Sequence, residues 1–218
     1  MKIRAFLFAI MLPAMAFAGA YEDMEQAMIR RDASSVISLL GRGMDINTVD
    51  RSGDTLLLQA VRLDMPELIE YLIQRRARLN NRNRNGETAL SIAAFSGKMP
   101  YVQRLVEAGA EVNFYGWPPL SYAAFNGHRD IVEYLLKRGA EIDAKTANGS
   151  TALFWAARNG HTEVVKLLLS NQADPSIANE HDETPVDAAM KGGSREIEGL
   201  LRSAGGRSGK SVVIELSK

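Results

Sequence analysis

Cysteine is absent from the 218 residues, and histidine occurs only three times. The lack of cysteine excludes disulfides, cysteine-linked lipid anchors and cysteine nucleophiles. It is compatible with an oxidising compartment but does not establish one. His128 and His161 each follow a glycine, and His181 has only Asp182 and Glu183 beside it. No metal site is expected, because such a site needs several convergent ligands, and no other cofactor is expected.

The arrangements that usually carry catalysis are also missing. No nucleophile has an available base beside it. Residues 204–211 approach the phosphate-loop pattern G-x-x-x-x-G-K-[ST], but Ala204 replaces its first glycine and no strand is expected before it. Acidic and basic residues are equal at 26 each, which argues against a general nucleic-acid binder. The chain is therefore expected not to be an enzyme.

Long apolar runs are limited to the beginning of the chain. Lys2 and Arg4 precede the apolar run 5–12, and small residues follow up to Ala16-Phe17-Ala18. The run is shorter than the ~20 residues that span a bilayer, so residues 1–18 are interpreted as a cleaved secretory signal peptide. Loss of Lys2 and Arg4 leaves 24 basic against 26 acidic residues, a net charge of −2. A periplasmic protein with no membrane attachment after cleavage is expected.

A short phrase that begins with threonine recurs along the rest of the chain. It occupies residues 55–60, 88–93, 151–156 and 184–189. Thr55 and Thr88 are 33 residues apart, as are Thr151 and Thr184. A fixed period of this size is typical of small helical units that stack and bury their apolar faces on their neighbours.

The residues 83–113 show how one unit is built. Asn85-Gly86 predicts a hairpin-like turn, and Thr88 opens a first helix that Gly97 ends. Pro100 is tolerated in the first turn of a second helix, which ends at Gly109. Each unit is therefore predicted to be a hairpin-like tip, a helix, a turn and a second helix.

This pattern resembles the ankyrin repeat, whose 33-residue period and threonine phrase it shares. The resemblance extends over about residues 21–206 and includes the junctions at 126–132 and 159–165 and the ending at 138–143. It implies an all-α ankyrin-repeat solenoid of about six helix-turn-helix repeats with hairpin-like tips. The expected domains are a signal peptide (1–18), an ankyrin domain (19–206) and a flexible tail (207–218). The expected repeats are 21–49, 50–82, 83–113, 114–145, 146–178 and 179–206.

Two departures from the family pattern stand out. The histidine of the family phrase is replaced throughout, by Leu58, Ser91, Ser121, Phe154 and Asp187. Leu58 and Phe154 are expected to stabilise their repeats by packing instead. The fourth repeat is three residues short, and residues 114–119, Phe-Tyr-Gly-Trp-Pro-Pro, stand where its tip should be. Their aromatic rings either bind a partner or fill the gap left by the missing residues.

The resemblance implies a binding surface on the tips and on the exposed side of the first helices. An aromatic centre with an arginine rim has the composition of a protein-binding hot spot. The predicted centre is Phe95, Tyr115, Trp117, Tyr122, Phe125 and Trp155, and the predicted rim is Arg62, Arg84 and Arg158. For Trp155, packing between repeats is an equal alternative.

The expected function is that of an exported, monomeric protein-binding module that assists or inhibits a periplasmic enzyme. One alternative is an effector that leaves the cell and binds a host protein. A further alternative is an enzyme whose site the sequence does not reveal. The sequence does not name the partner.

Overall fold

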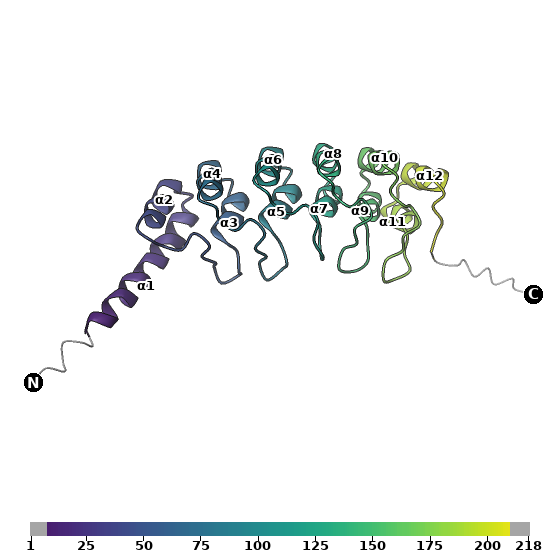
Figure 1. The fold of residues 1–218 in the computed structure, drawn as a ribbon. Coiled ribbons are helices and arrows are strands. Elements are labelled where there is room, and N and C mark those ends of the chain that lie inside the picture. Colours follow the sequence, from purple (N-terminus) through teal and green to yellow (C-terminus); the bar gives the residue numbers. More distant parts are fainter. Residues whose placement is uncertain (1–7, 210–218) are drawn as a thin grey trace, which may run out of the picture. The chain divides into compact units, whose positions relative to one another are not determined.

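The computed structural model describes residues 8–209. It divides into two compact units, residues 1–78 and residues 79–218, and each is described by itself. Every regular element within residues 8–209 is a helix, and one isolated bridge joins Val49 and Thr55. The helices follow one another in pairs, with a loop before each later pair (Figure 1). The predicted all-α class, built from pairs of helices, is confirmed.

The first unit contains four helices. They are α1 (Phe8–Ile29), α2 (Ala33–Gly41), α3 (Leu56–Arg62) and α4 (Pro66–Gln74). α1 packs against α2, α3 against α4, and α2 against α4. Asp32 caps α2, because its carboxylate accepts a hydrogen bond from the Ser35 N–H at 3.0 Å and from the hydroxyls of Ser34 and Ser35. These bonds, with the Ser35 hydroxyl as the largest cause, lower the pKa of Asp32 to about 2.

Helix α1 continues through Ala18, the position of the predicted cleavage. Within residues 19–29 of α1, Met24, Ala27 and Met28 are buried. Residues 1–7 of the predicted signal peptide lie outside the described residues. A search of residues 8–209 finds no helix long and apolar enough to cross a membrane.

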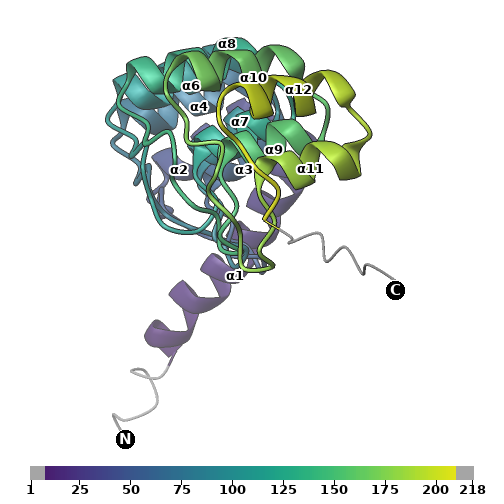
Figure 2. The same cartoon turned by 90° about the vertical axis from the view of Figure 1, so that its right-hand side faces the viewer.

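The second unit contains eight helices. They are α5 (Ala89–Phe95), α6 (Met99–Glu107), α7 (Pro119–Phe125), α8 (Arg129–Lys137), α9 (Ala152–Arg158), α10 (Thr162–Ser170), α11 (Pro185–Gly192) and α12 (Arg195–Ser203). The first helices α5, α7, α9 and α11 pack successively on one another, and so do α6, α8, α10 and α12. Within this unit the two rows lie one above the other, with the tips below the first helices (Figures 1 and 2).

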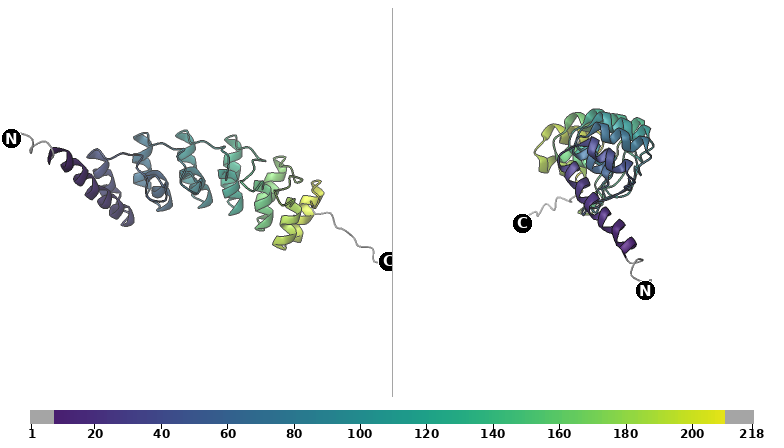
Figure 3. Two further views of the ribbon diagram at one scale, coloured as in Figure 1. Left: turned by 90° about the horizontal axis from the view of Figure 1, so that it is seen from below. Right: turned by 90° about the vertical axis from the view of Figure 1, so that its left-hand side faces the viewer.

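Local hydrogen bonds begin the first helices where the threonine phrase predicts. The hydroxyls of Thr88, Thr151 and Thr184 each accept the backbone N–H three residues further on, at 3.2, 3.3 and 3.4 Å. Such a cap satisfies a donor that the helix itself leaves unpaired. The alanines of the phrase are fully buried where the first helices pack together, which allows helices of only seven or eight residues to approach closely. Seen from below, successive helix pairs of this unit lie side by side (Figure 3).

The residues that replace the family histidine stabilise their repeats in two ways. Leu58 and Phe154 are buried, with 1% and 4% of their surface exposed, so the predicted packing is confirmed. Ser91 and Asp187 instead complete capping boxes, because their side chains accept the N–H groups of Thr88 and Thr184 at 2.9 Å. The sequence argument had not recognised these capping boxes.

The beginning of the predicted tail contacts the start of α11. The Thr184 hydroxyl donates to the Arg207 carbonyl at 2.7 Å, and the Gly209 N–H donates to the Asp187 carboxylate at 2.8 Å. The Ser208 hydroxyl also donates to Asp187. Residues 210–218, the remainder of the predicted flexible tail, lie outside the described residues. Residues 207–209 therefore cap the end of the second unit.

Candidate functional site

Five partly exposed aromatic side chains of the second unit form one connected cluster, and the buried Phe154 ring adjoins it, 5.4 Å from the Trp155 ring. We call this cluster the aromatic strip; its members are Phe95, Trp117, Tyr122, Phe125 and Trp155. The Trp117 ring centroid lies 5.1 Å from Tyr122, 6.0 Å from Phe125 and 5.0 Å from Trp155. Phe95 lies 5.7 Å from Tyr122 and 6.4 Å from Phe125. These spacings are those of favourable aromatic pairs.

Three successive repeats supply the strip. Phe95 is the last residue of α5, Tyr122 and Phe125 belong to α7, and Trp155 belongs to α9. Phe95 is 41% exposed, and the other four side chains are half-buried. The strip is therefore a surface that neighbouring helices hold together, and each of its rings still faces solvent in part.

Trp117 reaches the strip from the short fourth tip. The tip is attached to the preceding one by Arg82, whose Nη1 donates to the Tyr115 carbonyl at 3.0 Å. The Arg82 guanidinium also lies over the Phe114 ring, with its carbon 4.6 Å from the centroid. Only the spatial proximity of the two tips shows this role of Arg82.

Tyr115 does not join the strip. Its side chain is 82% exposed, and within the described residues its ring has no recorded contact with another ring. Two of the predicted central residues on the short tip are thus separated. Trp117 packs over α7 and α9, while Tyr115 projects into solvent.

Two backbone carbonyls of the strip accept hydrogen bonds from side chains at the helix-turn-helix junction of the next repeat. The Phe95 carbonyl accepts hydrogen bonds from Asn126 Nδ2 at 2.6 Å and from His128 Nε2 at 3.0 Å. The Phe125 carbonyl accepts the same pair of bonds from Asn159 at 2.7 Å and His161 at 2.9 Å. These double contacts place the two phenylalanines at the ends of short helices that would otherwise fray.

Two buried polar groups beside the strip lack a hydrogen-bond partner. They are Trp155 Nε1 and Ser121 Oγ. Ser121 occupies the position at which Ser91 and Asp187 form capping boxes, but Pro118 stands in place of threonine and has neither an N–H nor a hydroxyl. Buried polar groups without a partner are uncommon and destabilising. The fourth repeat therefore has a weaker local cap than its neighbours.

The three predicted rim arginines have different surroundings. Arg84, in a tip, and Arg158, at the end of α9, are exposed, and neither has a hydrogen-bond or ion-pair partner among residues 8–209. Arg62 belongs to the first unit, where its guanidinium pairs with Asp54 at 3.2 Å. The second unit thus brings together two of the predicted rim residues with the strip.

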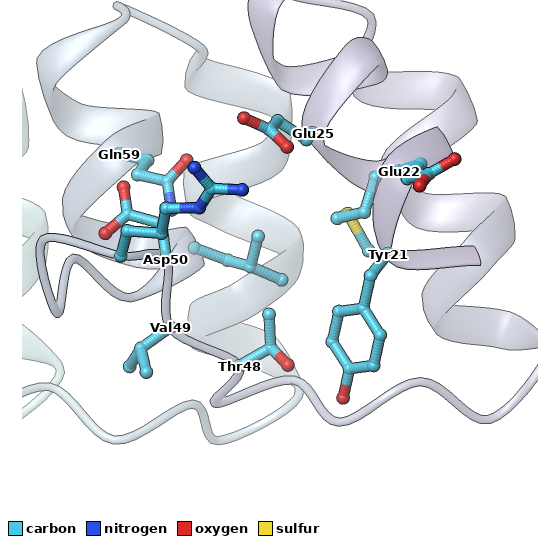
Figure 4. A pocket seen from close by; sticks show the side chains of 10 residues that line it. Tyr21, Glu22, Glu25, Thr48, Val49, Asp50 and Gln59 are labelled. Atoms are coloured by element: carbon cyan, nitrogen blue, oxygen red, sulfur yellow. The ribbon is translucent and has the colours of Figure 1, made fainter. Parts of the chain in front are cut away.

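A cleft of about 490 Å³ lies within the first unit. Tyr21, Glu22 and Glu25 of α1 line one side of it, and Val49, Asp50 and Gln59 line the other (Figure 4). Its lining holds carboxylates, Arg51 and Thr48 but no imidazole. Among residues 8–209 no group of three or more histidine, aspartate or glutamate side chains is placed to hold a metal ion.

His181 is exposed at the last tip of the second unit. Its backbone N–H donates to Asn179 Oδ1 at 2.9 Å as part of the tip. His181 therefore belongs to a turn at the surface.

The family model for ankyrin repeats (three copies) matches residues 24–114, 57–146 and 141–207. The chain therefore belongs to the ankyrin-repeat family, whose repeats form protein-binding modules and are typically not enzymes. It is 36% identical over 78 residues to the mouse B-cell lymphoma 3 protein homolog, covering 35% of this chain and 17% of that protein. It is 34% identical over 95 residues to the ankyrin repeat domain-containing protein SAT10 of Stachybotrys chartarum, covering 44% of this chain and 5% of that protein. The similarity thus covers less than a fifth of either relative.

Proposed function

We propose that this protein binds another protein through the aromatic strip and has no enzymatic activity of its own. The observation that carries the proposal is the partly exposed cluster of five rings on the first-helix side of the second unit. Rigid, connected aromatics supply much of the binding energy in protein interfaces. Family membership supports the same class of function, because ankyrin repeats generally bind proteins.

The absence of catalysis is part of this proposal. The described residues offer no clustered metal ligands, and the rings of the aromatic strip are partly exposed to water. Chemistry at protein sites usually needs a pocket that positions reacting groups and excludes water. An activity screen with His181→Ala as the matched variant tests the alternative; an activity that this substitution removes would contradict the proposal.

We further propose that the protein is exported to the periplasm, where it assists or inhibits a neighbouring enzyme. The support is the layout of residues 1–18, with two basic residues, a short apolar run and Ala16-Phe17-Ala18. Amino-terminal sequencing of the secreted protein is expected to begin at Gly19. Cell fractionation distinguishes this proposal from an effector that leaves the cell, because an effector would accumulate in the medium.

Affinity capture tests the binding surface. The protein and its Trp117→Ala/Phe125→Ala variant are used as baits in the same periplasmic extract, and co-eluting proteins are identified by mass spectrometry. Removal of two central aromatic anchors is expected to weaken binding by at least about 30-fold, since a hot-spot side chain contributes roughly 2 kcal/mol or more. Circular dichroism must show unchanged helical content.

Tyr101→Ala on the second helix α6 is the matched control. It removes an aromatic side chain of the same unit from the opposite row of helices. The control is expected to capture the same partner as the unaltered protein. Equal capture by the Trp117→Ala/Phe125→Ala variant would show that the aromatic strip is not the binding surface.

A further inference from the structure

The charge around the aromatic strip is positive. Helices α5, α7 and α9 contain no acidic residue, and their single charged side chain is Arg158. The adjoining tip segments 82–87, 114–117 and 145–150 add Arg82, Arg84 and Lys145 against one carboxylate, that of Glu87. The strip therefore lies in a locally basic part of a chain whose total charge is zero.

These cations are not neutralised locally. Arg84, Lys145 and Arg158 are exposed and have no recorded partner among residues 8–209, while the Glu87 carboxylate accepts a hydrogen bond from Asn83 at 2.7 Å. The Arg82 guanidinium contacts Phe114 and Tyr115 instead of a carboxylate.

The second helices of the same unit show a different arrangement. Glu133 of α8 pairs with Lys137 at 2.6 Å and with Arg129 at 3.1 Å. Lys166 of α10 pairs with Glu163 at 2.9 Å, and Arg202 of α12 pairs with Glu198 at 2.9 Å. Glu133, Glu163 and Glu198 thus neutralise cations within one turn of their own helices, whereas Arg84, Lys145 and Arg158 beside the strip have no recorded carboxylate partner among residues 8–209.

We infer that the occupant of the aromatic strip is an acidic segment of another protein, with an apolar side chain packed on Trp117 and Phe125 and with carboxylates paired to Arg84 and Arg158. This inference rests on the proposed function and specifies the chemistry of the partner. Arginine is suited to such contacts, because its guanidinium binds carboxylates through two parallel hydrogen bonds. Complementary charge also steers the encounter and fixes its orientation.

The last tip defines one end of this surface. Glu180 and Asp182 are exposed there, so this end is acidic while the tips near α5 and α9 are basic. An acidic segment is repelled by the last tip and attracted by Arg84 and Arg158. The acidic part of the partner is therefore expected to lie against α5, α7 and α9.

Selection from a phage library of random dodecapeptides tests the inference. The library is bound to the purified protein at low salt, and binders that also bind the Trp117→Ala/Phe125→Ala variant are discarded. The retained peptides are expected to carry net negative charge and at least one aromatic or branched aliphatic residue. For a retained peptide, Arg158→Glu is expected to lower the association rate constant about tenfold and to reduce its salt dependence.

Arg195→Glu is the matched control, since Arg195 is an exposed arginine at the start of the second helix α12. It is expected to leave the association rate within about twofold of that of the unaltered protein. Retained peptides without acidic character, or equal effects of Arg158→Glu and Arg195→Glu, would overturn the acidic partner and leave the strip as the binding surface. A failure to find any peptide that distinguishes the protein from its Trp117→Ala/Phe125→Ala variant would overturn the strip itself. Self-association that Trp117→Ala abolishes would identify a second copy as the occupant and also overturn the inference.

Discussion

The contact between Gly127 and His161 gives a direct test of how neighbouring repeats position the strip. Gly127 has a positive φ of +74°, and a Cβ atom at this position would lie 2.5 Å from Nδ1 of the His161 ring. The same ring donates from Nε2 to the Phe125 carbonyl at 2.9 Å. Gly127→Ala must therefore displace a side chain that holds the end of α7.

Gly160→Ala is the matched control. Gly160 has nearly the same φ, +78°, but a Cβ there meets no atom within 4 Å. Both substitutions place alanine in the left-handed region, at a cost of about 1–2 kcal/mol. Only Gly127→Ala also displaces the imidazole, which adds about 1 kcal/mol for the lost hydrogen bond and about 1 kcal/mol or more for repacking.

Gly127→Ala is therefore expected to lower the free energy of unfolding by about 2 kcal/mol more than Gly160→Ala. Urea denaturation followed by circular dichroism measures both values. A double-mutant cycle with His161→Ala is expected to remove most of the difference, because the ring that the added methyl group would meet is then absent. Equal destabilisation by the two glycine substitutions would refute the steric and hydrogen-bonding role assigned to His161.

Three further predictions follow from the caps and the strip. Ser91→Ala is expected to destabilise by about 1 kcal/mol, since it breaks a capping box, whereas Ser121→Ala is expected to be neutral or stabilising in the same urea assay; the reverse order would contradict the assigned caps. Burial raises the pKa of Asp187, but hydrogen bonds from Ser208 and from the Thr184 and Gly209 N–H groups outweigh it and hold the pKa below the ordinary 3.8. The ionised Asp187 carboxylate therefore stabilises the folded protein above pH 3.8, and this stabilisation is lost as the pH falls through the lower folded pKa. Asp187→Asn is expected to make the free energy of unfolding less dependent on pH in this acidic range; an unchanged dependence would contradict this. Trp117→Phe or Trp155→Phe is expected to abolish an exciton couplet in circular dichroism that Tyr115→Phe preserves, because the two indole centroids lie 5.0 Å apart with their planes tilted by 33°; a couplet that survives either tryptophan substitution would contradict that contact.

Much of the fold could be predicted from local patterns. Thr88, Gly97 and Pro100 mark helix ends because caps and turns are formed by atoms a few residues apart. In the structure Thr88 caps α5, Gly97 follows two residues after its last residue, and Pro100 lies in the first turn of α6. The buried alanines follow from the repeat period, since a position that faces a neighbour in one repeat does so in the others.

The candidate site could be predicted only in part. The aromatic residues of α5, α7 and α9 share a face because their helices pack successively, and the rings of Phe95, Tyr122, Phe125 and Trp155 are in contact; that they bind a partner stays a prediction. The short fourth tip departs from the repeat period, so its conformation cannot be inferred from the other repeats. Its path depends on the Arg82 contacts, and no local rule distinguishes Trp117, which packs, from Tyr115, which does not.

The sequence by itself determined the ankyrin class, the helix ends, the small buried positions and the unusual fourth tip. Each of these depends either on hydrogen bonds within one repeat or on the period that relates the repeats. Only the tertiary structure decided that Trp117 lies against Trp155, that His161 holds the Phe125 carbonyl, and that the cations beside the strip have no recorded carboxylate partner among the described residues. The first two of these contacts join residues of different repeats. They depend on how one repeat packs on the next, which a local pattern does not specify.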